Sequence, residues 1–219
     1  VKVYAEEGSH VELTMPQMLG TEVLDLTDIG GLLEKGASVE LVKMELGAKK
    51  VYTGALMTLK GDGSSFTAHI GYQGFTGQHL DMNYVARHLG RKTESLMESN
   101  GVLNGNAFKL FRGSIDFVKG CAGSVGNEKE DVLLLGDDVV NQTIPLILCA
   151  EEDVEGNHGA SIGELDEKTL FYLMSRGFTK EAAEAMIAGA RLEAIAAEIP
   201  FTEVREQVEK YLEEQHEEL

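Results

Sequence analysis

The chain has 219 residues, with 19 Lys and Arg against 37 Asp and Glu, which gives a formal net charge of −18. This charge disfavours nucleic-acid binding and docking on anionic lipid, because both need clustered basic side chains. Apolar residues make up 43% and charged residues 26% of the chain, the balance of an ordinary globular protein. We therefore expect a folded protein whose partners include neither a nucleic acid nor a membrane.

The two cysteines, Cys121 and Cys149, are too few for a disulfide framework or a four-cysteine metal site. They fit a reducing compartment, and we expect a cytoplasmic protein. The nearby Lys119 could lower the pKa of the Cys121 thiol, whereas Cys149 ends an apolar run and is expected to be buried and inert. The apolar runs are only a few residues long, well short of the roughly 20 residues that a membrane-spanning helix needs.

Up to Gly163 the sequence is dominated by short runs in which every second residue is apolar. This period of two is typical of β-strands, because alternate side chains point to one face. The clearest runs lie at residues 1–3, 11–13, 39–41, 51–59, 66–72, 115–117 and 144–148. Glycine-containing segments at 61–63, 101–105, 120–126 and 136–138 are predicted to be the turns between them.

Two all-β architectures fit this spacing. A sandwich would be built from hairpins with two-residue turns, and a β-solenoid would stack strands coil on coil. Few two-residue hairpin signals are present, which favours the solenoid, but no strict repeat length decides between the two.

The composition changes at Gly163, after which Ala, Glu and Leu dominate. Asp166 is a predicted N-cap of a helix over 167–176, which Gly177 would end. Thr179 is predicted to cap a second helix that Pro200 terminates, and Thr202 a third. We therefore divide the chain into a β domain, residues 1–163, and a helical domain, residues 164–219.

Histidines are the first candidates for chemistry. His158 lies among carboxylates in the segment EEDVEGNHG at 151–159, where it is either a surface residue of a turn or a metal ligand. His69, His79 and His88 could approach one another in a solenoid, although strand histidines so far apart in sequence more often serve in packing. The chain contains no nucleophile elbow, P-loop, HExxH or Rossmann fingerprint, so an autonomous enzyme is poorly supported.

Several segments, taken in order, resemble one family. They are FRGSI at 111–115, VLLLG at 132–136, Pro145, EDV at 152–154, HGASIG at 158–163, LDE at 165–167, and LFYL at 170–173 followed by SRG at 175–177. This order is similar to the core of the SufB/SufD family of iron–sulfur cluster assembly proteins. The match is strong from about residue 108 to 191 and weak before about residue 39.

The resemblance implies a right-handed parallel β-helix followed by a helical C-terminal domain. It also implies a non-catalytic scaffold that pairs through its β-helix with a second SufB/SufD protomer, a paralogue or a second copy of the chain. A SufC-type ABC ATPase would dock on the C-terminal helices. The residues that match this helical segment are Leu165, Leu170, Phe171, Tyr172 and Arg176.

The resemblance also implies where a transient iron–sulfur cluster would lie. SufB-like members use a cysteine and a glutamate, and SufD-like members supply a histidine at the shared interface. Here the cysteine position holds Glu130 and the glutamate position holds Gly159, whereas the histidine is present as His158. The chain therefore looks closer to SufD, with His158 as the expected metal ligand and Glu130 as an expected oxygen ligand to a cluster that the chain alone does not hold stably.

A second interpretation comes from another class. A β-solenoid could bind or hydrolyse carbohydrate, with carboxylates such as Asp81 and Glu94 along one groove. Aromatic residues are only 6% of the chain and Trp is absent, which argues against a platform for stacking sugars.

Overall fold

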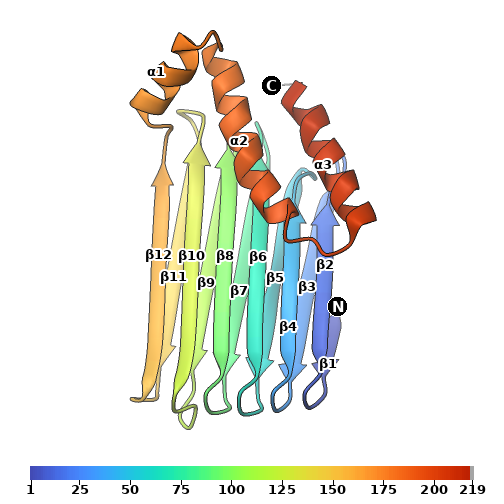
Figure 1. Cartoon of the computed structure of the whole chain (residues 1–219), viewed down its shortest axis with the longest axis vertical. Coiled ribbons are helices and arrows are strands. Elements are labelled where there is room, and N and C mark those ends of the chain that lie inside the picture. Colours follow the sequence, from blue (N-terminus) through green and yellow to red (C-terminus); the bar gives the residue numbers. More distant parts are fainter. Residues whose placement is uncertain (218–219) are drawn as a thin grey trace.

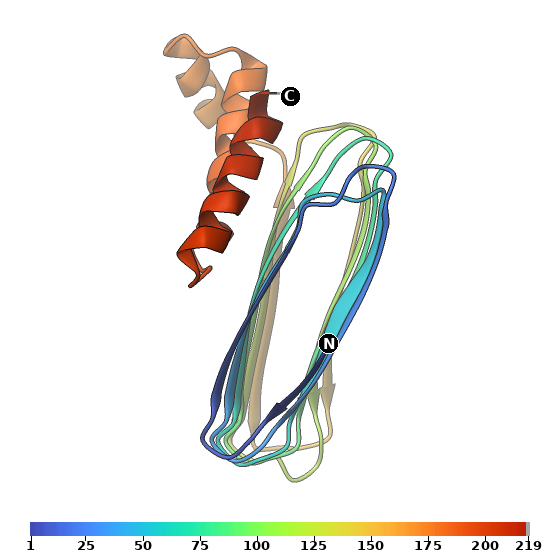
Figure 2. The same cartoon turned by 90° about the vertical axis from the view of Figure 1, so that its right-hand side faces the viewer.

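The computed structural model describes residues 1–217, and these form a flattened β-solenoid with three helices after it. Figure 1 shows the strands side by side in a ladder, and Figure 2 shows the two sheets facing each other along the solenoid. The odd sheet contains β1 (Lys2–Ala5), β3 (Leu24–Leu33), β5 (Lys50–Leu59), β7 (His79–His88), β9 (Phe108–Phe117) and β11 (Val140–Cys149). The even sheet contains β2 (His10–Gln17), β4 (Ser38–Glu45), β6 (Ser65–Gly74), β8 (Glu94–Leu103), β10 (Ser124–Leu134) and β12 (Val154–Gly163).

Consecutive strands alternate between the sheets, and every described strand pairing is parallel. The predicted mainly β fold, a parallel β-solenoid followed by C-terminal helices, is therefore confirmed, and the hairpin-built sandwich is excluded. Corner turns place glycines at positive φ, as at Gly36 (64°) and Gly63 (68°), a conformation that favours glycine because it has no Cβ.

The inward side chains of both sheets fill one continuous core. Large members with no exposed surface include Phe66, Tyr72, Phe111 and Phe117. Because pairing is in register, inward residues of successive coils stack in columns along the solenoid. Burial of these columns is the main stabilising contribution, at about 25 cal/mol per Å² of apolar surface.

The predicted glycine breaks were partly wrong. Gly101 lies inside β8 and Gly126 inside β10, so the turns are shorter than the runs of small residues suggested. At Gly101 an added Cβ would lie 2.0 Å from the ring of Tyr72, so glycine is needed here to make room for a core side chain.

The helices are α1 (Glu167–Ser175), α2 (Lys180–Ala196) and α3 (Thr202–Glu217). The predicted caps are confirmed for α1 and α2, since Asp166 accepts a hydrogen bond from the Thr169 amide and Thr179 one from the Ala182 amide. Thr202 is already the first residue of α3 rather than its cap. The division of the chain into domains at residues 163 and 164 stays a prediction.

Helices α2 and α3 pack on the outer face of the even sheet (Figure 2). The contact is a second apolar cluster of strand residues Val42, Met44, Val102 and Leu133 with helix residues Ala188, Leu192, Ile195, Val208 and Leu212. Arg191 of α2 also pairs with Asp131 of β10. These contacts fix α2 and α3 against strands β4, β8 and β10 of the even sheet.

Candidate functional site at the open final coil

The solenoid ends in an uncovered coil. Strands β11 and β12 are each the last strand of their sheet and pair with one neighbour, β9 and β10 respectively. Ile144, Leu146 and Leu148 of β11 are 50%, 44% and 48% exposed. An edge with unpaired backbone groups and exposed apolar side chains is a template for pairing with another chain.

His158 belongs to this coil and faces its interior side. It lies in strand β12, so its placement in a turn was wrong, although the side chain is exposed as that alternative expected. Gly156 faces inward, because a Cβ there would lie 3.0 Å from the ring of Phe117, and residues two apart in a strand share a face. His158 is in register with Glu128 of β10, and it is exposed because no strand follows β12 in the sheet.

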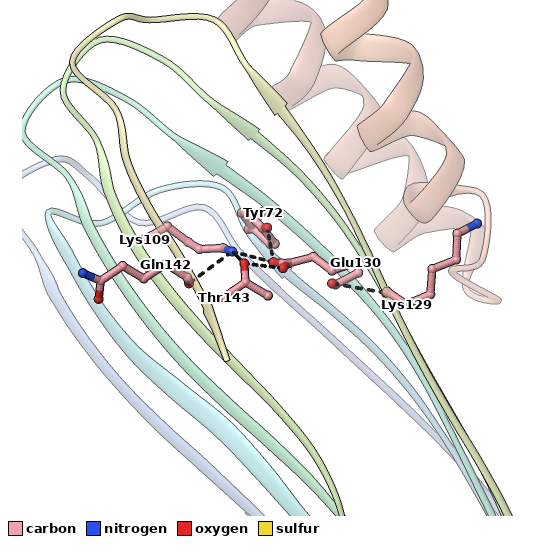
Figure 3. Close-up of polar contacts among 7 residues, drawn as sticks. Tyr72, Lys109, Lys129, Glu130, Gln142 and Thr143 are labelled. Atoms are coloured by element: carbon pink, nitrogen blue, oxygen red, sulfur yellow. Dashed lines mark hydrogen bonds and ion pairs between the residues drawn. The ribbon is translucent and has the colours of Figure 1, made fainter. Parts of the chain in front are cut away.

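Glu130 lies two residues from Glu128 and points into the core, where Figure 3 shows its partners. Its Oε1 forms an ion pair with the Lys109 ammonium at 2.6 Å and accepts a hydrogen bond from the Tyr72 hydroxyl at 2.7 Å. Its Oε2 accepts a hydrogen bond from Thr143 at 2.6 Å. Lys109 also donates to Thr143 at 2.9 Å, so the four side chains form one closed network.

The network is almost entirely shielded from water. Lys109 and Glu130 have 0% exposed side chains. Burial lowers the pKa of Lys109, and the charge of Glu130 opposes that change. Burial together with the Glu130 charge raises the pKa of Tyr72 well above its usual value. The network therefore holds the Glu130 carboxylate firmly, and its role as a cluster ligand stays a prediction.

Glu128 is a residue that sequence reasoning missed. It is 5% exposed, and neither carboxylate oxygen has a hydrogen-bond partner among the described residues. Burial, and next the nearby charge of Glu130, raise its pKa to about 7. A spacing of two from Glu130 was the available signal, because it places both carboxylates on one face of a strand.

The residues predicted to bind the ATPase lie within α1 or just beyond its two ends, and α1 has no buried residue. Phe171 is 74% and Tyr172 55% exposed, and the Arg176 guanidinium lies over the Tyr172 ring at 5.1 Å. Leu165 and Leu170 are partly buried at the base of the helix. Their binding role stays a prediction, and the helix presents an uncovered aromatic face.

The histidines expected to approach one another do not come together. His79 lies on β7 and stacks on Phe108 at 4.4 Å, and His69 lies on the even sheet, 3.7 Å from Glu98. His88 is buried, and its ring nitrogens contact Thr93 and Ser95 at 2.7 and 2.9 Å. The shared metal site is therefore excluded by their placement on different faces and sheets.

Burial of His88 makes the free energy of unfolding depend on pH. Burial lowers its pKa to about 4, with Asp116 opposing the change. The unfolded chain therefore binds more protons than the folded chain between about pH 6.5 and pH 4. The stability that depends on a neutral, buried His88 ring is present above about pH 6.5 and is lost as the pH falls toward 4. Between pH 7 and pH 5 we expect its contribution to the free energy of unfolding to fall by on the order of 2 kcal/mol. Urea denaturation of the wild type and His88→Gln at both pH values measures this, and equal pH dependence in the two would contradict it.

The two cysteines have environments opposite to those expected. Cys121 is buried, and burial raises the pKa of its thiol despite the nearby Lys119. Cys149 is exposed, because it ends β11 on the open coil, and its thiol lies 3.0 Å from the Glu151 carbonyl oxygen. Neither expectation about these thiols was correct.

The groove proposed for carbohydrate binding does not exist in the structure. Asp81 lies on β7 of the odd sheet, where it pairs with Arg112, whereas Glu94 lies on β8 of the even sheet. Side chains pointing outward from opposite sheets cannot line one groove.

The architecture and the site define a class: a parallel β-solenoid with an open last coil, an inward histidine on that coil, and a helical extension. A family model described as "SUF system FeS cluster assembly, SufBD core domain" matches residues 1–191. The chain belongs to the SufBD family of iron–sulfur cluster assembly proteins.

Curated relatives agree with this assignment. An iron–sulfur cluster assembly SufBD family protein of Mycobacterium tuberculosis is 31% identical over 205 residues, covering 92% of this chain and 24% of the relative. The iron–sulfur cluster assembly protein SufB of Bacillus subtilis is 27% identical over 202 residues, covering 92% of this chain and 43% of the relative. The chain thus spans less than half the length of these relatives. None of the described helices is both long and apolar enough to cross a membrane.

Proposed function

We propose that this chain is a non-catalytic scaffold in a cytoplasmic SUF complex, pairing through its final coil with a second SufBD protomer, either a paralogue or another copy. The observation that carries the proposal is the open coil of β11 and β12, with His158 on its inward side. Edge pairing between two such coils would extend both sheets and bring the inward residues of each protomer together.

A nascent iron–sulfur cluster is the cargo at this junction rather than a resident cofactor. Of the two residues predicted to contact it, His158 is open to an approaching partner, whereas Glu130 would have to leave Lys109 first. A carboxylate is also a harder ligand than a thiolate. Glu130 at the cysteine position and Gly159 at the glutamate position favour a SufD-like role over a SufB-like one.

A SufC-type ATPase would dock on the C-terminal helices, through the uncovered face of α1 and the residues around it. Because α2 and α3 are packed on strands β4, β8 and β10 of the even sheet, force applied to these helices passes to the solenoid. Dimerisation of two ATPases on ATP would then move two protomers relative to each other as rigid bodies, opening and closing the junction.

The test is co-expression with the ATPase and the second protomer, followed by size-exclusion chromatography and an anaerobic absorbance spectrum. We expect His158→Ala to lower cluster yield severalfold while leaving ATPase binding intact, because His158 lies within β12 and outside the C-terminal helices on which the ATPase would dock. His69→Ala is the matched control, as a strand histidine away from the final coil. Equal cluster yields from wild type and His158→Ala would rule out the role of His158.

A further inference from the structure

We propose that Glu128 is a further ligand at this site, so that Glu128 and His158 together bind ferrous iron at the open end of the solenoid. The inference deepens the proposed function and rests on it for the identity of the metal as cargo. Glu130 is not a ligand of this iron, because its carboxylate is held by Lys109, Tyr72 and Thr143.

The first observation concerns the column of in-register residues that contains Glu128. Register partners on the inward face of the even sheet run through Leu13, Leu41, Ala68, Met97, Glu128 and His158. At this position four successive coils carry an apolar residue, and the carboxylate appears only in the coil next to the histidine. Packing of an apolar core does not account for this change, because the preceding coils show that the column accepts Leu, Ala and Met.

The second observation is that the Glu128 carboxylate is buried without protein donors. Both oxygens are buried and lack a hydrogen-bond partner in the described part of the chain, and the residue is 5% exposed. Burying a carboxylate without a partner is costly, and such groups in folded proteins call for an explanation, of which a cation is one. By contrast, both oxygens of the Glu130 carboxylate, two residues away in the same core, have hydrogen-bond or ion-pair partners.

The third observation concerns the opposite wall. Gly113 of β9 faces Glu128, since a Cβ there would lie 2.9 Å from its carboxylate. Pro145, in register with Gly113 on β11, has a side chain without a hydrogen-bond donor. These two positions of the odd sheet therefore supply no side-chain donor to the Glu128 carboxylate.

The chemistry of the pair fits ferrous iron. Strands in a sheet lie about 4.8 Å apart, so in-register Glu and His side chains on one face can bind the same cation. Imidazole with carboxylate is a ligand combination of non-haem Fe(II). Two ligands leave the remaining positions open to sulfide or to residues of a pairing protomer, as suits a metal that is passed on.

Binding is tested on the full chain alone under anaerobic conditions, with Co(II) as a spectroscopic probe and Fe(II) in a parallel titration. Because His10, Glu12 and Glu40 bring potential ligand atoms within 4.8 Å of one another, all measurements use a His10→Ala background. The variants are Glu128→Gln, which keeps the side-chain volume, and His158→Ala. Glu155→Gln is the matched control, since it removes the same charge from an exposed position of β12. Urea denaturation verifies that each variant is folded.

We expect saturable binding of one Co(II) per chain, an affinity loss of about tenfold or more for Glu128→Gln and for His158→Ala, and no change for Glu155→Gln. Unchanged affinity in folded Glu128→Gln, or no binding by the parent, overturns the inference. The readout needs neither the ATPase nor a second protomer. Intact Co(II) binding with no cluster in the assembled complex would therefore count against the proposed function alone.

Discussion

Replacing Lys109 with Met is expected to lower the free energy of unfolding by about 3–5 kcal/mol, the largest effect of any single change considered for this core. The substitution keeps most of the side-chain volume but leaves the Glu130 carboxylate, which is 0% exposed, without its counter-charge. Tyr72 and Thr143 still donate to that carboxylate, but neutral donors do not offset the cost of burying it. The urea midpoint and slope of wild type and Lys109→Met give the difference directly.

Lys129→Met is the matched control, because Lys129 is the residue before Glu130 and points away from the core toward the helices (Figure 3). We expect it to change stability by no more than about 0.5 kcal/mol. The double variant Lys109→Met with Glu130→Gln should recover part of the loss, since it removes the unpaired charge. A cost below about 1 kcal/mol for Lys109→Met, similar to an exposed pair, would show that the network does not stabilise the core as described.

The sequence predicted strands β5 and β6 well because their inward residues are mostly apolar. The period-two runs at 51–59 and 66–72 coincide with β5 and β6, whose inward residues include Val51, Met57, Phe66 and Tyr72. Strands β8 and β10 were missed in part because their inward positions include Ser95, Ser99, Ser124 and Glu128, which break the apolar alternation. A solenoid accepts inward hydroxyl groups because neighbouring coils supply partners, as Ser124 does for Thr93.

From the sequence, only the site residues that belong to a local motif, or lie at a fixed spacing from one, could be predicted. The segment HGASIG identified His158, and the spacing from VLLLG identified Glu130. The partner Tyr72 is 58 residues from Glu130 in the sequence, and no local pattern connects them. The two cysteines were assigned in reverse for the same reason: the corner at Cys121 turns into the core, whereas the apolar strand before Cys149 has no coil beyond it.

Phe171→Asp is expected to weaken ATPase binding about a hundredfold without lowering the stability of the chain. Helix α1 buries none of its own residues, so its aromatic face contributes little to folding and the substitution removes few intramolecular contacts. Phe171 is 74% exposed beside Tyr172, whose ring is covered by Arg176. Aromatic residues and Arg are the side chains that most often dominate binding energy at interfaces, and a buried carboxylate in place of the ring would be strongly unfavourable.

Phe201→Asp is the matched control, because Phe201 is 48% exposed in the turn between α2 and α3, away from α1. Binding of the purified ATPase is measured by calorimetry or by co-elution in size-exclusion chromatography, with urea denaturation of both variants alongside. Loss of binding in Phe171→Asp but not in Phe201→Asp places the contact on α1, at the end of the chain segment that continues directly from the strand carrying His158. Equal affinity for Phe171→Asp and wild type would move the docking surface off this helix, and with it the route by which ATP-driven motion reaches the final coil.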